Sequence, residues 1–152
     1  MENLDVYDKN RRKTDKVVER GVPLTSDEFK LVIHVCIINS DNKMLIQQRQ
    51  SFKEGWPNLW DLTVGGSVIA GETSSVGAAR ELFEEIGYKI DGNVLRPIFT
   101  VNFKGGFDDY YVINADVKLK ELSLQKSEVK GVKWATKEEI LQGIAYGEFI
   151  PY

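Results

Sequence analysis

The chain has 152 residues, a length that predicts one domain with a hydrophobic core of its own. Its formal net charge of −3 excludes a general attraction for nucleic acid or for an anionic membrane, so a phosphorylated ligand would need a metal ion or a few well-placed cations. One cysteine excludes an internal disulfide, and a polar start over residues 1–16 with no apolar run of about 20 residues predicts a cytoplasmic protein.

The first part of the chain predicts an arm and a pair of strands. Residues 1–28 are polar, and we expect either an irregular arm or a short hairpin. The β-branched run LVIHVCIIN over 31–39 predicts a strand covered on both faces. Asp41-Asn42 is a turn signal that joins this strand to a second one over 44–48.

A helix is predicted in the middle of the chain. Residues 51–61 are rich in Gly, Pro and Trp and indicate a loop, and 62–64 form a short strand that leads into Gly65-Gly66. The pattern is helical from about residue 73 to 86, where Gly87 ends it. The apolar positions expected to share one face of this helix are Val76, Ala79, Leu82, Phe83 and Ile86.

Further strands are expected over 94–103, 110–117 and 129–134. Thr136 and Glu139 have the spacing of a capping box, which opens a second helix through about residue 142. Strands and two helices in this mixed order predict an α/β fold whose sheet is covered on both faces.

Three glutamates give the first helix a chemical character. Glu81, Glu84 and Glu85 stand at i, i+3 and i+4 and so share a face, away from the apolar residues. Like charges this close repel, and the arrangement is explained if a divalent cation lies among them, because Mg²⁺ prefers carboxylate oxygens. The alternative is a plain solvated acidic face.

The segment GSVIAGETSSVGAARELFEEIGY over residues 66–88 resembles the signature of the Nudix family. Seven fixed identities match at the required spacing, and the one departure is Tyr88 in a slot that is usually aliphatic. The likeness extends over roughly residues 29–145. It implies an α/β/α sandwich with a mixed sheet over a single domain, 1–152, and the hydrolysis of a diphosphate linkage with Mg²⁺, Mn²⁺ being the alternative ion.

The resemblance also assigns roles to residues. It implies that Glu84 and Glu85 are metal ligands, that Glu81 is a further ligand or the base that activates water, and that the Gly65 carbonyl completes the set. Roles in holding the loop and helix together are implied for Gly66, Glu72, Arg80 and Gly87, with an ion pair between Glu72 and Arg80.

A narrower resemblance lies in LIQQRQSFKEGWPNLW over residues 45–60, which is similar to isopentenyl-diphosphate isomerases and to a related subgroup of hydrolases. It implies that Arg49 and Lys53 contact a diphosphate; the alternative is that both are ordinary exposed cations. The isomerases need a cysteine and two histidines, and this chain has Gly65, Ser67 and Lys30 at those places. Their absence argues against isomerisation.

Several single residues are weaker candidates. Asp109 is a candidate metal ligand or base near the isomerases' acidic ligands, or else part of a turn. Glu128 is a late acid of the kind that some Nudix enzymes use. Cys36 and His34, within the apolar run, are expected to be structural.

The aromatic residues leave two interpretations open. Trp56 and Trp60 line the mouth of the site or, with Trp134, belong to the core. Phe103 and Tyr110 stack a base or simply pack.

These observations predict an enzyme that hydrolyses a nucleoside diphosphate derivative or a similar small molecule. Two alternatives stay open: an isomerase, and a non-catalytic binding module, although such modules usually lose the signature glutamates. The expected partner is the small-molecule diphosphate, without nucleic acid or membrane, and a homodimer is left open.

Overall fold

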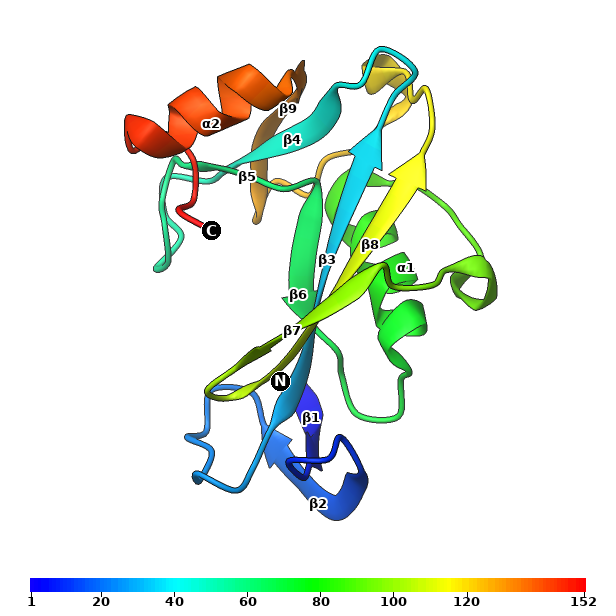
Figure 1. Cartoon of the computed structure of the whole chain (residues 1–152), viewed down its shortest axis with the longest axis vertical. Helices are drawn as coiled ribbons and strands as arrows, with labels where there is room; N and C mark the ends of the chain where they lie inside the picture. The colour runs from blue at the N-terminus through cyan, green and yellow to red at the C-terminus, as the bar shows by residue number, and fades with distance from the viewer. The chain divides into compact units, whose positions relative to one another are not determined.

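The computed structural model describes residues 1–152 (Figure 1). The strands are β1 (Asn3–Tyr7), β2 (Lys13–Glu19), β3 (Lys30–Ile38), β4 (Met44–Arg49), β5 (Trp60–Asp61), β6 (Val64–Ser67), β7 (Phe99–Phe103), β8 (Gly106–Asn114) and β9 (Val129–Ala135). The α-helices are α1 (Ser74–Ile86) and α2 (Lys137–Ala145), and short 3₁₀ turns lie at Gly92–Val94 and Leu119–Glu121. No helix is long and apolar enough to cross a membrane.

Seven strands form one mixed sheet in the order β5-β4-β3-β8-β7, with β6 paired to β3 and β9 paired to β4. Neighbours β3 and β8 point the same way in Figure 1, whereas β4 runs antiparallel to β3, β5 and β9. A mixed sheet with two α-helices confirms the α/β class that the sequence predicted.

The chain divides into two compact units, each assembled from separate segments. The first unit contains Met1–His34, Gly65–Arg80 and Asp91–Tyr111, and its buried side chains include Leu4, Val6, Leu31 and Ile33. The second contains Val35–Val64, Glu81–Ile90 and Val112–Tyr152, and one of its core clusters joins Ile46, Ala135, Phe149 and Ile150.

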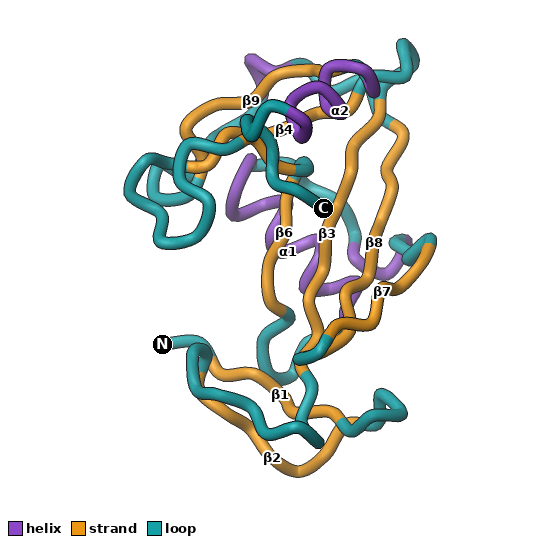
Figure 2. Tube along the Cα trace, turned by 60° about the vertical axis from the view of Figure 1, so that its left-hand side comes forward, coloured by secondary structure: helices purple, strands orange, loops and turns teal.

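The polar arm is a hairpin, one of the two forms expected for it (Figure 2). Strands β1 and β2 pair antiparallel around a turn in which Asp8 accepts bonds from the Asn10 and Arg12 amides. The hairpin also contacts the loop before α1, because the Gly71 amide donates to Asp5 Oδ2 at 2.9 Å. It is therefore anchored within the first unit.

The apolar face predicted for α1 is wrong in part. Val76 and Phe83 are 41% and 51% exposed, whereas Ala78, Leu82 and Ile86 are fully buried. The buried residues recur every four positions, and Val76 and Phe83 lie outside that stripe. Glu81 and Glu85 lie on the buried arc as well, not on a separate polar face.

Three predicted strands also differ from expectation. Residues 62 and 63 of the strand expected over 62–64 lie between β5 and β6, outside any strand. The strand expected from residue 94 begins only at Phe99, because Pro97 lacks an amide hydrogen and restricts the residue before it. Strand β8 begins at Gly106 rather than 110 and includes Asp108 and Asp109, a residue type that is depleted in strands.

Candidate active site

Helix α1 holds Glu81 and Glu85 one turn apart in the second unit. Their side chains are 7% and 8% exposed, whereas Glu84 is exposed. Gln47 of β4 donates its amide to Glu85 Oε2 at 2.7 Å and to the Thr63 carbonyl at 2.8 Å. Gln47 therefore fixes the orientation of the Glu85 carboxylate.

The electrostatics around Glu85 favour a cation. Burial and, after it, the charge of Glu81 raise the pKa of Glu85 to about 8, although the hydrogen bond from Gln47 lowers it. The charges of Glu128 and Asp61 raise this pKa further. Buried carboxylates with several like-charged neighbours are stabilised by a bound cation, so this donor set fits a hard divalent ion.

No three acidic, histidine or cysteine side chains converge to enclose an ion. The structure brings Glu81 and Glu85 together in a buried position and leaves Glu84 at the surface. Mg²⁺ usually keeps several waters and binds through one or two carboxylates together with substrate phosphates, so a closed cage is not required.

The loop before β9 docks onto the end of α1. The Ser123 amide donates to the Ile86 carbonyl and the Gln125 amide donates to the Glu85 carbonyl, each at 2.9 Å. Gly87 has a φ of 73°, which lets the chain turn there. It also leaves room for the loop, because a Cβ at this position would lie 2.9 Å from Ser123 Cβ. The same loop carries Glu128 into the surroundings of Glu85.

The two candidate diphosphate ligands are paired with acids. Lys53 forms an ion pair with Glu128, and Arg49 lies 3.8 Å from Asp61 while donating to the Gly55 carbonyl at 2.9 Å. Their side chains are 25% and 22% exposed, so neither is an ordinary free surface cation. Lys53 would have to exchange Glu128 for a phosphate in order to bind one.

In the first unit the predicted pair between Arg80 and Glu72 is present, with Arg80 Nε 2.6 Å from Glu72 Oε1. Arg80 also donates to the Ser67 carbonyl at 3.0 Å. Gly77 makes room for this pair, because a Cβ there would lie 3.2 Å from Glu72 Oε2. These contacts hold the loop before α1 against the helix.

Gly65 lies against the ring of His34. A Cβ at position 65 would lie 2.6 Å from His34 Cδ2 and 2.8 Å from Nε2. The ring is held by a 2.8 Å hydrogen bond between Nδ1 and Asp108 and by stacking on Tyr110, with centroids 5.1 Å apart. A cysteine therefore does not fit at the place where the isomerases carry one.

Asp109 is fully buried and surrounded by donors of the first unit. Its carboxylate accepts hydrogen bonds from Arg11, Ser74 and Thr100. Burial favours its neutral form, but these three bonds outweigh burial and lower the pKa of Asp109. They explain the buried charge without a metal ion.

The remaining candidates have structural surroundings. Trp60 packs against the second unit's core and lies under Lys133, whereas Trp56 is 51% exposed and Trp134 is half-buried. Tyr110 stacks on His34 and Phe99, and Phe103 is 40% exposed. Cys36 is buried, as expected of a core thiol.

Sequence reasoning missed Gln47 and Asp61. Both are polar residues at buried places, 4% and 7% exposed. The sequence does contain a signal for the burial of Gln47, because this residue directly follows two apolar residues, Leu45 and Ile46, in β4. Only the structure shows that this amide contacts Glu85.

Comparison with known proteins supports the interpretation of residues 66–88 as a Nudix signature. The model of the NUDIX domain family matches residues 28–151, which leaves the β1–β2 hairpin outside the match. An uncharacterized Nudix hydrolase of Listeria monocytogenes is 49% identical over 100% of this chain and 90% of its own length. An isopentenyl-diphosphate Delta-isomerase of Pectobacterium atrosepticum is 28% identical over 90% of this chain and 78% of its own length.

Two solved structures share the fold. The crystal structure of DR0079 from Deinococcus radiodurans has a TM-score of 0.80 and 26% identity, covering 97% of this chain and 91% of that one. The NUDIX domain of NrtR from Shewanella oneidensis, solved with ADP ribose, has a TM-score of 0.60 and 19% identity, covering 82% and 81%. With its family model matched over most of its length, the chain belongs to the Nudix family of hydrolases.

Proposed function

We propose that the protein uses Mg²⁺, with Mn²⁺ as the alternative ion, to hydrolyse the diphosphate linkage of a nucleoside diphosphate derivative or a similar small molecule. The observation that carries the proposal is the pair of buried carboxylates, Glu81 and Glu85, whose surroundings contain further acids. Such a pair is costly in a folded protein unless a cation is bound to it.

A bound Mg²⁺ would neutralise phosphate charge and make a coordinated water more acidic. The chain's own residues have separate tasks. Glu85 and Glu84 are the proposed ligands, Glu81 is a further ligand or the base, and Gln47 keeps the Glu85 carboxylate oriented. The Gly65 carbonyl is included in the ligand set on the family resemblance alone.

Arg49 and Lys53 are the proposed contacts for the diphosphate. Each is already near an acid, so the arriving phosphates would compete with Asp61 and Glu128 for the two cations. A diphosphate carries more negative charge than a carboxylate, and arginine binds phosphate oxygens in the same bidentate geometry that it uses for carboxylates. This exchange favours a diphosphate over a singly charged ligand.

Two kinds of support bear on the substrate and the reaction. The neighbouring NrtR domain was solved with ADP ribose, a nucleoside diphosphate derivative. The missing isomerase residues and the contact between His34 and Gly65 favour hydrolysis over isomerisation. A cytoplasmic location remains part of the proposal, on the strength of the sequence alone.

The test is a panel of nucleoside diphosphate derivatives, ADP-ribose among them, incubated with Mg²⁺ and followed by phosphate release after a coupling phosphatase. Glu85→Gln should lower kcat at least about 100-fold, because even residues that only orient a metal ligand are typically worth 10- to 100-fold. The control is Glu138→Gln, an exposed position on α2, which should keep full turnover.

The melting temperature separates a chemical effect from misfolding. Glu85→Gln should be about as stable as the metal-free parent at neutral pH, because burial and Glu81 raise the pKa of Glu85 to about 8 and a neutral amide then replaces a largely protonated acid of similar shape. Full Mg²⁺-dependent turnover in Glu85→Gln would overturn the metal assignment. The absence of phosphate release with every compound of the panel would support a binding module, and conversion of isopentenyl diphosphate would support an isomerase.

A further inference from the structure

A cavity of about 680 Å³ lies entirely within the first unit. Its walls come from the β1–β2 hairpin, the loop that leads to β3 and the turn between β7 and β8. Its volume is in the range of sites that bind small molecules, roughly 300–1,000 Å³. Five of its lining residues are apolar: Leu4, Val18, Val22, Leu24 and Phe103.

The only charged side chains that line the cavity are Lys30 and Lys104. No ion pair or hydrogen bond in the structure engages either ammonium group. Lys30 is half-buried, and burial followed by the charge of Arg20 lowers its pKa. The cavity is therefore lined by apolar side chains, by the hydroxyls of Thr25 and Ser26 and by two cations without an acid; Lys30 is half-buried and Lys104 is exposed.

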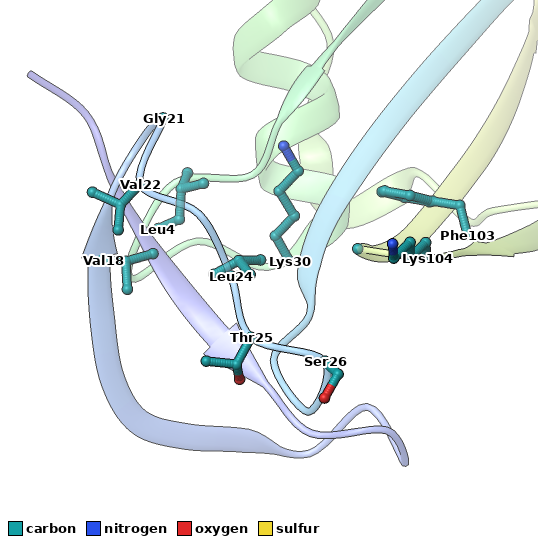
Figure 3. A pocket seen from close by; sticks show the side chains of 11 residues that line it. Leu4, Val18, Gly21, Val22, Leu24, Thr25, Ser26, Lys30, Phe103 and Lys104 are labelled. Carbon is teal, nitrogen blue, oxygen red and sulfur yellow. The ribbon is translucent and has the colours of Figure 1, made fainter.

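The wall that bears the lysines is held by backbone contacts. The Lys30 amide donates to the Gly105 carbonyl at 2.9 Å, and a Cβ at Gly106 would lie 2.1 Å from the Lys30 carbonyl oxygen. The start of β3 is thus pressed against the β7–β8 turn. Figure 3 shows Lys30 rising between the Leu4 and Val22 side of the cavity and Phe103.

We propose that this cavity is a binding site for a small amphipathic anion, whose apolar body packs on the five apolar residues and whose carboxylate or phosphate pairs with Lys30 and Lys104. An apolar lining alone would accept any apolar molecule of suitable size. Two unpaired ammonium groups beside it select against neutral and cationic ones, because both attract an anion and the half-buried Lys30 gains more from an opposite charge than a fully solvated cation does. The site does not depend on the proposed hydrolase activity.

Calorimetry on the full chain tests the proposal with four probes of equal chain length: decanoate, decyl phosphate, 1-decanol and decyltrimethylammonium. EDTA is present throughout, so that no phosphate binds through a metal ion. Decanoate and decyl phosphate should bind with one-to-one stoichiometry and at least about tenfold more tightly than the other two probes. A preference between the two anions would identify the headgroup.

Variants place the binding in the cavity. The double change Lys30→Gln and Lys104→Gln should weaken decanoate about tenfold or more and leave the weak binding of decanol unchanged. The control is a double change, Lys126→Gln and Lys118→Gln, which alters the net charge equally in the second unit. Val22→Asp, at a position 48% exposed, adds a negative charge to the lining and should weaken the anions selectively.

Three outcomes would overturn the proposal. In one, neither anion binds more tightly than decanol. In another, the two double variants lose the same affinity, which would mean that net charge alone attracts the anion. In the last, the protein binds vesicles of anionic lipid but no monomeric anion, which would make the lysines part of a membrane contact.

Discussion

The Gln47 side chain links β4 to the candidate site, because its amide donates to Glu85 and to the Thr63 carbonyl. Both acceptors belong to the second unit and all three groups are buried or nearly so. A buried polar group that loses its partner costs about 1–3 kcal/mol. The effects of Gln47 on stability and on activity are therefore expected to be linked.

Gln47→Leu should lower the free energy of unfolding by about 1–3 kcal/mol and lower kcat about 10- to 100-fold. The reason is that Glu85 and the Thr63 carbonyl each lose a donor while the volume of the side chain is kept. Urea unfolding and steady-state kinetics measure the two effects. Gln48→Leu is the control, because that amide donates to the Asn58 carbonyl at an exposed place. Equal effects of the two changes would contradict this role for Gln47.

The residues of the candidate site differ in how well the sequence predicts their positions and contacts. The spacing of Glu81 and Glu85 predicts that they share a face of the helix, and the resemblance to the Nudix signature implies the Arg80–Glu72 pair that the structure contains. The contacts of Gln47 and Asp61 could not be predicted, since periodicity shows that Gln47 lies in a buried strand but not that it contacts Glu85, and no motif pairs Asp61 with Arg49. Glu84 was grouped with the other glutamates by spacing, and only the structure separates it as exposed.

At the scale of elements, helix α2 begins at the predicted capping box. The Glu139 amide donates to Thr136 Oγ1 and the Thr136 amide donates to Glu139 Oε1, both at 3.1 Å. The helix continues past residue 142 to Ala145, because the next proline is Pro151 and the turn with positive φ comes only at Gly147. Starts of helices are thus easier to predict than their ends, since a cap is local chemistry.

Thr136→Ala should lower the free energy of unfolding by about 1 kcal/mol, the usual cost of removing a threonine cap. The Glu139 amide would lose its acceptor at the first turn of α2. Chemical denaturation measures the change, with Lys137→Ala at the exposed next position as the control, expected within about 0.5 kcal/mol of the parent. An unchanged midpoint for Thr136→Ala would mean that water replaces the cap at no cost.

At the scale of the whole molecule, the reactivity of one thiol reports on unfolding. Burial, followed by the charge of Asp61, raises the pKa of Cys36 to about 12. The folded thiol therefore stays neutral at pH 8–10, whereas an exposed thiol has an ordinary pKa near 8.5. A group whose pKa is raised on folding adds stability below its unfolded pKa and loses it as the pH rises toward the folded value.

Ellman's reagent should leave Cys36 unmodified at pH 8 and modify it fully in urea. The difference in stability between the parent and Cys36→Ala should shrink as the pH rises above about 8.5, because only the parent gains an ionised thiol on unfolding. Fast labelling of the folded protein at pH 8 would show that β3 opens locally. Labelling at several urea concentrations distinguishes local from global opening.

The pairing of distant strands could not be predicted. β3 and β8 are neighbours in the sheet although dozens of residues separate them, and periodicity gives strands without their partners. The α/β class followed from the order of elements and the family from one motif. Whether the chain is one domain, and whether it forms a dimer, stay predictions.

The contact between His34 and Gly65 restricts which substitutions can be accepted at these two positions during evolution. Cysteine at position 65 alone would overlap the imidazole ring, and removing His34 alone would leave Asp108 without its ring partner. The two positions are therefore expected to be epistatic, since a cysteine at position 65 is tolerated only after His34 has changed. We expect a mutational path that places a cysteine at position 65 to pass through a less stable intermediate, whichever of the two positions changes first.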